Sequence, residues 1–179
     1  MPNTDSRCLE LFPEWLATLG SDVLAVSKLL RADGVRAEIK EQVAGALSYL
    51  LESMDLMPDG LDDLGFLDNA FVLREAASRA VSESAEAPDV LQRLAADAAL
   101  MKEFLGDSDH QRLSRYVQGL RALEVRKRTA PKILASNELL NQFVEEVSAW
   151  VSAYEVPAFT KDDKSLVKLR SFMATKLPS

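Results

Sequence analysis

The stretch VAGALSYLLESMDLMPDGLDDLGFLDNAFVLREA, residues 43–76, decides the fold that this sequence predicts. Apolar residues recur at helical spacing over residues 35–54 and again over residues 66–81, which predicts two amphipathic helices. Between them, Pro58 disfavours the α conformation of the preceding residue, and Gly60 accepts a positive φ. We therefore predict a hairpin made of a helix, an acidic turn and a second helix over residues 35–82.

The same stretch carries a motif: a tyrosine, an apolar pair, D-L-x-P-D, and then G-x-L-D followed by apolar residues. The matching residues are Tyr49, Asp55, Leu56, Pro58, Asp59, Gly65, Leu67 and Asp68. Over residues 49–73 the pattern resembles the domain-of-unknown-function family numbered 1232, also called YkvA-like. Ser53-Met54 stands where a proline is usual, and Asn69 replaces the second Asp of the closing pair. The resemblance implies a helical module and no particular reaction, because the family has no established one.

The composition is that of a globular, helix-rich protein. Of 179 residues, 47% are hydrophobic and 27% are charged, and glycine is scarce. This length suits one well-packed domain, and no run approaches the roughly 18 apolar residues of a membrane span. The first 15 residues lack a basic start followed by an apolar core, so we expect no signal peptide. Cys8 is the only cysteine and cannot form an internal disulfide, which favours a cytoplasmic location.

The rest of the chain also shows helical periodicity, and its boundaries are assigned from capping and breaking residues. Gly20 should end a first helix and Ser21 should cap a second. A single helix should start at Pro88, carry its apolar stripe from Val90 to Leu105 and end at Gly106. The later helices should start at two capping boxes, Ser108–Gln111 and Thr160–Asp163, and at Asn137. No segment shows the alternation of a strand. The fold prediction is all-α: one compact bundle of about seven or eight helices over residues 1–179, with the hairpin at its centre.

Carboxylates crowd the predicted turn: Asp55, Asp59, Asp62, Asp63 and Asp68. A divalent cation held by Asp55, Asp59, Asp63 and Asp68 is one interpretation, because Mg²⁺ and Ca²⁺ take oxygen ligands. The favoured interpretation is structural. Asp59 would order the turn, Asp62 or Asp63 would cap the second helix, and Asp68 would face the helix dipole. We expect no cofactor.

The charge is distributed unevenly. Residues 1–107 carry a net charge of −11 and residues 108–179 a net charge of +4, within a total of −7. The halves could attract each other within a molecule or between molecules. The main basic patch consists of Arg121, Arg126, Lys127, Arg128 and Lys132. RNA, an anionic membrane or an acidic partner would suit it, but a solvated helix C-terminus explains it as well and is favoured.

Single residues add little evidence for catalysis. His110 is the only histidine and is expected at an exposed helix start, and Cys8 lacks the basic neighbourhood of a nucleophile. The aromatic residues Trp15, Phe143 and Trp150 are expected in the core, as is Phe172.

The favoured function is therefore a non-enzymatic interaction or scaffolding protein of the cytoplasm, with a protein as partner. Self-association is compatible with the charge asymmetry, and nucleic-acid binding is not expected from an acidic chain. One alternative is a divalent-cation-dependent enzyme or sensor that uses the Asp cluster. Another is a peripheral membrane protein that inserts Phe66, Phe71 and Leu73.

Overall fold

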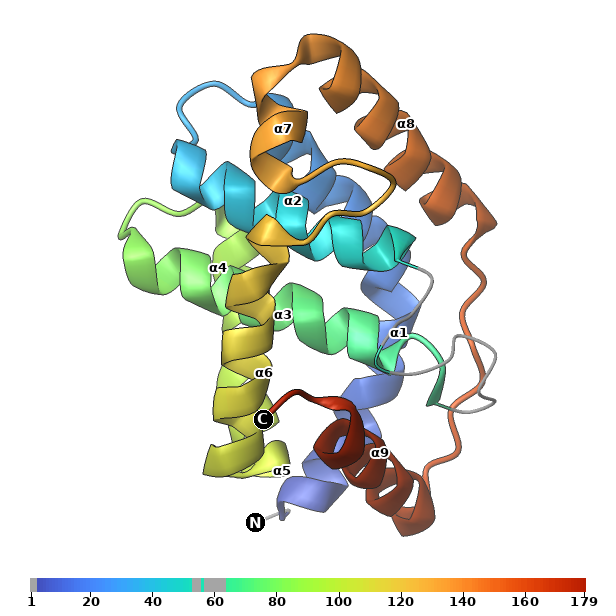
Figure 1. Cartoon of the computed structure of the whole chain (residues 1–179). Coiled ribbons are helices and arrows are strands. Elements are labelled where there is room, and N and C mark those ends of the chain that lie inside the picture. The colour runs from blue at the N-terminus through green and yellow to red at the C-terminus, as the bar shows by residue number, and fades with distance from the viewer. Residues whose placement is uncertain (1–2, 53–55, 57–63) are drawn as a thin grey trace.

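A computed structural model describes residues 3–52, 56 and 64–179, and in these residues the chain is helical without any strand (Figure 1). The prediction of an all-α fold is confirmed. The helices are α1 (Thr4–Ser27), α2 (Ala37–Leu51), α3 (Leu67–Glu83), α4 (Asp89–Ala95), α5 (Ala98–Leu105), α6 (Asp107–Gly119), α7 (Ala130–Ala135), α8 (Asn137–Ala153) and α9 (Asp163–Lys176), with 3₁₀ helices η1 (Lys28–Arg31) and η3 (Leu120–Ala122).

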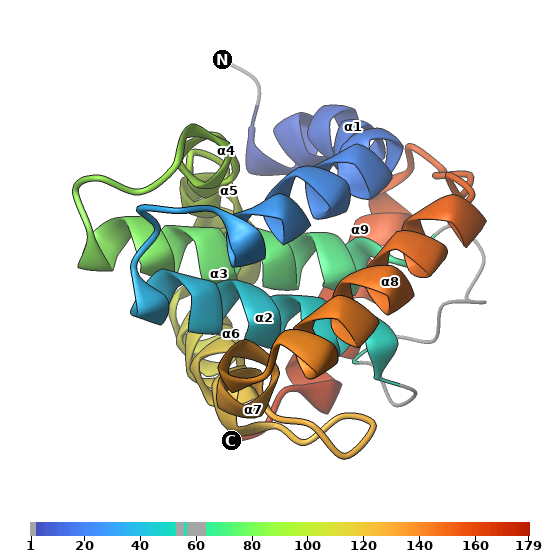
Figure 2. The same ribbon diagram turned by 90° about the horizontal axis from the view of Figure 1, so that it is seen from above.

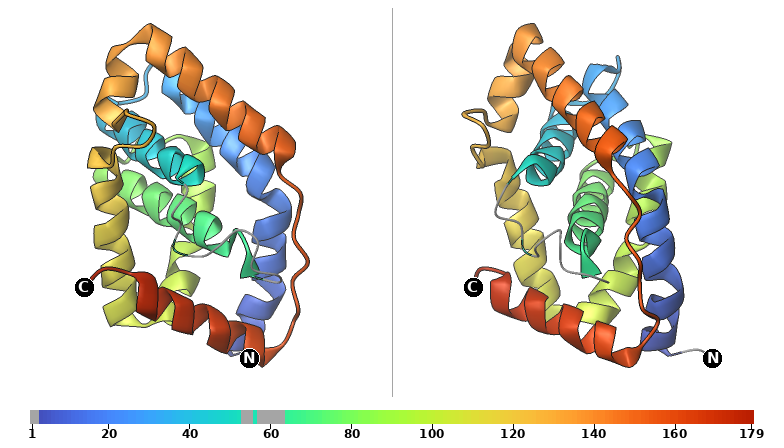
Figure 3. Two further views of the ribbon diagram at one scale, coloured as in Figure 1. Left: turned by 45° about the vertical axis from the view of Figure 1, so that its right-hand side comes forward. Right: turned by 90° about the vertical axis from the view of Figure 1, so that its right-hand side faces the viewer.

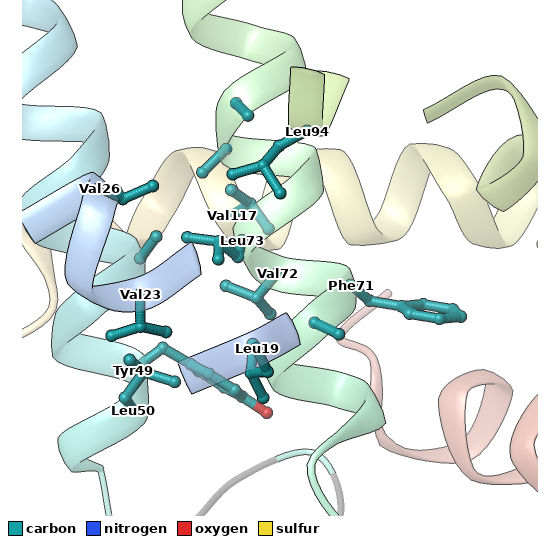
Figure 4. Packing of buried hydrophobic residues seen from close by; sticks show 14 of the residues in the cluster. Leu19, Val23, Val26, Tyr49, Leu50, Phe71, Val72, Leu73, Leu94 and Val117 are labelled. Atoms are coloured by element: carbon teal, nitrogen blue, oxygen red, sulfur yellow. The ribbon is translucent and has the colours of Figure 1, made fainter. Parts of the chain in front are cut away.

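The predicted hairpin helices, α2 and α3, lie side by side at the centre of the molecule (Figure 2). Helices α1, α4 and α6 pack against α3, while α7 and α8 pack against α2. Buried apolar side chains from α1 to α9 form one continuous core. Figure 4 shows part of it, where side chains of α1, α2 and α3 converge: Leu19, Val23, Tyr49, Leu50, Val72 and Leu73.

A single helix, α1, replaces the two that were expected on either side of Gly20. Helix α8 packs closely at this point, and a Cβ atom on Gly20 would lie 3.3 Å from Cδ1 of Tyr154. Gly20 therefore permits a close helix contact instead of ending a helix. The N-cap is Asn3, whose Oδ1 accepts a hydrogen bond of 2.8 Å from the Ser6 N–H. Ser21 is an exposed residue inside the helix and caps nothing.

The single helix expected between Pro88 and Gly106 is divided into α4 and α5. The division falls at Asp97, whose N–H donates to the Leu94 carbonyl and whose carboxylate receives the Nε–H of Arg74 at 2.8 Å. A side chain of α3 thus fixes the joint between α4 and α5. Helix α5 ends at Gly106 as predicted, and Gly106 has a φ of 83°.

Three capping predictions are wrong by one or two residues. Helix α6 begins after Gly106, so Ser108 lies within its first turn and caps nothing. Ser136, not Asn137, caps α8 by accepting from the Leu139 N–H, and Asp162, not Thr160, caps α9. In both of these cases the capping residue is the one with an extended backbone immediately before the helix.

Helix α9 lies apart from the central hairpin. It crosses one end of the bundle, below α1, α5 and α6, and an extended segment connects it to α8 (Figure 3). Leu166, Leu169 and Met173 bury its inner face in the common core, and its outer face remains exposed. No helix in the described part of the chain is both long enough and apolar enough to cross a membrane.

Candidate functional site

Two residues of the motif, Tyr49 and Asp68, meet inside the hairpin. The Tyr49 hydroxyl donates to Oδ2 of Asp68 over 2.5 Å and accepts from the N–H of Leu56 over 2.7 Å. Both side chains are completely buried. Asp68 lies in the first turn of α3, where the unpaired N–H groups and the helix dipole favour a carboxylate. This arrangement ties the end of α2 to the start of α3.

The backbone before α3 is also held by packing. Phe66 precedes the helix with a φ of 70°, in the left-handed region that costs a non-glycine residue about 1–2 kcal/mol. The centroid of its ring lies 5.9 Å from that of Trp150 and 5.1 Å from that of Tyr154, two residues at the C-terminal end of α8. These contacts stabilise the conformation, so the entry to α3 is fixed by α8.

The remaining residues of the expected Asp site are not placed by the structure. Asp55, Pro58, Asp59, Asp62 and Asp63 lie outside the described residues, while Gly65 is buried. Within the described part, no three His, Cys, Asp or Glu side chains are grouped so that they could hold a metal ion. The structural interpretation of Asp68 and the cation interpretation of the cluster therefore both remain predictions.

The prediction that Arg126, Lys127 and Arg128 end a helix is wrong, because α6 ends at Gly119 and the 3₁₀ helix that follows it, with Arg121, ends at Ala122. Residues 125–128 instead form a tight turn, in which Val125 and Arg128 exchange hydrogen bonds of 2.9 and 3.1 Å. The two central residues, Arg126 and Lys127, have φ values of 54° and 66°. Positive φ at both central positions is typical of a two-residue hairpin turn, which the sequence Arg-Lys does not signal.

Much of the charge of this patch is neutralised locally. Arg126 forms an ion pair of 3.1 Å with Glu146 of α8, and Arg128 pairs with the same carboxylate. Burial alone would raise the pKa of Glu146, but hydrogen bonds from Arg128 and Arg126 lower it below its ordinary value. Lys132 lies 3.9 Å from Glu124. Three of the five basic residues are thus engaged by carboxylates of the chain itself.

Sequence reasoning missed Arg74 of α3, the most buried basic side chain among the described residues. Its side chain is only 2% exposed, and it pairs with Asp97 at 2.8 Å and with Asp22 of α1 at 3.8 Å. The guanidinium also lies 4.3 Å from the Trp15 ring centroid. Burial lowers the pKa of Arg74, and the two carboxylates oppose that change. Arg93 of α4 completes the network by contacting Asp22 at 2.7 Å.

His110 is not the exposed helix-start residue that the sequence suggested. Its Nε2 lies 3.1 Å from Oε2 of Glu75, a carboxylate on α3 whose side chain is 4% exposed. The pair links α6 to α3, and Arg79 repeats the link one turn later through a 2.9 Å hydrogen bond to Ser114. Nothing in the sequence signals this pairing, because Glu75 lies 35 residues from His110 along the chain.

Cys8 and the apolar residues of the hairpin are enclosed. Burial raises the pKa of the Cys8 thiol to about 12, so the reactive thiolate is scarce at neutral pH. Phe71 is fully buried and Leu73 is 3% exposed. Phe66 is half-buried against α8. Insertion of Phe71 and Leu73 into a membrane would require the bundle to open, and the peripheral-membrane alternative stays a prediction.

The outer face of α9 is the part of the described structure that best fits a binding surface. A groove of about 830 Å³ runs along it. The described residues that line it are Thr160, Asp162, Asp163, Lys164, Ser165, Val167, Lys168, Ser171, Phe172, Thr175 and Lys176. Val167 is 65% exposed, which is unusual for an apolar residue in this molecule. Sequence analysis placed Phe172 in the core, but it is half-buried and borders this groove.

The lysine side chains beside the groove have no partner in the part of the chain that the structure describes. Lys164, Lys168 and Lys176 form no ion pair with any described residue. Positions 164, 168 and 176 lie on one side of the helix, over about 18 Å at 1.5 Å per residue. The two acidic residues that also line the groove, Asp162 and Asp163, lie at the N-cap and in the first turn of α9, where the helix dipole favours them.

Arg170 fastens α9 from its inner side. Its guanidinium contacts Asp5 of α1 at 2.6 Å, donates to the Phe104 carbonyl at 2.9 Å, and stacks 4.2 Å from the Phe104 ring centroid. The inner and outer faces of α9 thus differ in kind. The inner face is anchored by specific contacts, and the outer face presents lysines beside two separate apolar residues, Val167 and Phe172.

Comparisons with known proteins add no assignment. No family model, no curated protein and no solved structure matches the chain. The resemblance to the YkvA-like family therefore stays a prediction that rests on its motif residues alone.

Proposed function

We propose that this chain is a non-enzymatic interaction protein that docks an acidic protein segment in the groove along α9. The observation that carries the proposal is the combination of exposed Val167 with three lysines that lack a partner among the described residues. Binding sites are commonly apolar with a few convergent polar groups. Charges at such a site set the choice of partner and the rate of encounter more than the affinity.

The other charged clusters support this choice by contrast. Arg74 is enclosed by carboxylates, and Glu146 engages both Arg126 and Arg128. Charges that are already paired offer a ligand little, because binding would have to break an existing contact. The lysines of α9 have no such contact to lose among the described residues.

A smaller hollow of about 380 Å³ between α6 and the C-terminal residues is a weaker candidate. Arg112, which lines it, donates to the Leu177 carbonyl and, at 3.1 Å, to the Pro178 carbonyl, and pairs with Asp109 at 2.8 Å. Its charged group is already engaged in holding the end of the chain. Arg115, which also lines the hollow, forms no ion pair with a described residue, but none of the large exposed hydrophobic residues lies here, so the hollow remains the weaker candidate.

A site-specific photo-crosslink tests the proposal. A photo-reactive phenylalanine analogue is placed at Val167 in the full chain and, as a matched control, at Ala99, an exposed residue of α5. We expect an adduct from position 167 only, with an acidic segment of the partner at the crosslink. The partner is then purified, and its direct binding should weaken in high salt because screening reduces attraction between exposed charges.

The proposal is wrong if position 167 gives no adduct beyond that of position 99. It is equally wrong if the purified partner binds a Lys164→Glu/Lys168→Glu variant as well as it binds the original chain. Circular dichroism of the variant establishes that it is folded before the binding is compared.

A further inference from the structure

The connection between α3 and α4 presents a second surface of unpaired charge, with the opposite sign. Residues 80–92 contain no basic side chain, and Glu83, Glu86 and Asp89 within them are all exposed. None of the three forms an ion pair with a described residue. We call these three carboxylates, with exposed Ala85 between them, the acidic corner.

The acidic corner cannot reach the α9 groove of its own molecule. The two surfaces lie at opposite ends of the bundle, with the α3–α4 connection at upper left and α9 at lower right in Figure 1. The view from above in Figure 2 separates them as well. Their charges can therefore be matched only between molecules.

We propose that the α9 groove takes the acidic corner of a second copy of this chain. The inference rests on the proposed function and names its partner. Three carboxylates of the corner would lie against the three lysines of the groove, and the two carboxylates of the groove, Asp162 and Asp163, lie at its N-terminal end. The small side chain of Ala85 would let the corner approach Val167, which is 65% exposed, without a steric clash.

The contact is head-to-tail, because each copy uses a different surface. Such a heterologous contact leaves one groove and one acidic corner free on every dimer, so it extends into a ring or a filament as the protein concentration rises. The attraction is between exposed charges. The association should therefore be strong at an ionic strength of 0.01 M, where the Debye length is about 30 Å. It should be weak in 1 M salt, where the Debye length is about 3 Å.

The first experiment is sedimentation velocity over a range of protein concentrations, at low and at high salt. We expect the average mass to rise from the monomer value of 19.7 kDa to at least twice that value at low salt. In high salt we expect the monomer value at every concentration. A chain that stays monomeric at low salt and high concentration overturns the inference.

The second experiment identifies the surfaces by charge reversal. The groove variant is Lys164→Glu/Lys168→Glu, and the corner variant is Glu83→Lys/Glu86→Lys. Each should lose self-association, because its own groove and corner then carry like charges. An equimolar mixture should regain it, because the acidic groove of one variant fits the basic corner of the other.

A control variant, Lys28→Glu/Lys127→Glu, changes the net charge by the same amount as the groove variant at two exposed positions away from the groove. It should associate like the unmodified chain. Association that survives either reversal, or a mixture that stays monomeric, places the contact elsewhere and overturns the inference.

The outcomes separate this inference from the proposed function. If the chain stays monomeric while position 167 crosslinks to another acidic protein, the docking function holds and only the partner assigned here is wrong. If position 167 gives no specific adduct and the reversals have no effect on association, both are wrong.

Discussion

The charges around Arg74 and the charges along α9 are arranged in opposite ways. Around Arg74, two carboxylates and a second arginine surround a side chain that is 2% exposed. Along α9, three lysines project around an exposed apolar residue without a partner among the described residues. Buried charges must be paired because desolvation is costly, whereas exposed charges need no partner for the fold. The first arrangement therefore belongs to the fold, and the second is free to recognise another molecule.

Arg74→Ala should give the largest loss of stability. It leaves Asp22 and Asp97 without their central partner and opens space beside Trp15, so we expect the free energy of unfolding to fall by about 3–5 kcal/mol. Arg93→Ala is the control, because the Arg93 side chain is 56% exposed, and we expect a loss of at most about 1 kcal/mol. Urea denaturation measures both, and equal losses would contradict the comparison.

Tyr49→Phe should have the next largest effect. It removes the hydroxyl that links Asp68 to the Leu56 N–H, and we expect a loss of about 1.5–3 kcal/mol because the lost hydrogen bond is to a buried acidic group. Tyr154→Phe removes a 2.6 Å hydrogen bond to the Leu16 carbonyl and should cost less, about 0.5–1.5 kcal/mol. The order of the two midpoints in denaturant tests the role assigned to Tyr49.

Glu146 should make the stability depend on acid pH. Its folded pKa lies below its ordinary value of 4.5, so its contribution is fully present above about pH 4.5 and is lost as pH falls through the folded pKa. We expect Glu146→Gln to lower stability at neutral pH by at most about 1 kcal/mol, because the group is partly exposed. Below pH 4.5 the two proteins should converge. Thermal melts of both proteins across pH 2–7 test this. If the two plots of stability against pH run parallel, Glu146 is not the group responsible for the acid dependence.

The groove variant Lys164→Glu/Lys168→Glu should change stability little, within about 0.5 kcal/mol. Neither lysine has an ion pair with a described residue to lose, and both side chains are exposed. A loss comparable to that of Arg74→Ala would show that α9 depends on these charges, and it would remove the contrast between the two regions. Thermal melting at low and high salt makes the measurement.

If Asp68 is structural, millimolar Mg²⁺ or Ca²⁺ should change the melting temperature least of all. A cation bound to the folded state alone would raise the melting temperature by mass action. We expect equal melting temperatures with the cation and with EDTA. A rise of several degrees that Asp68→Asn abolishes would instead support a cation site at the Asp cluster.

The sequence by itself determined the elements that depend on near neighbours. Helical periodicity located α2 and α3 to within about three residues, because residues three and four apart share one helix face. It also identified Gly106 as a helix end, because a positive φ there suits glycine. Tyr49 and Asp68 were singled out by their motif, although nothing in the motif placed them in contact.

Only the tertiary structure decided the features that join distant parts of the chain. Gly20 is predicted as a helix end until α8 is packed against it. No local pattern shows that Asp22 and Asp97 surround Arg74. The α9 groove likewise depends on which helix face the bundle covers. Charge pairing and close packing act through space between residues far apart in the sequence, so local patterns carry no signal for them.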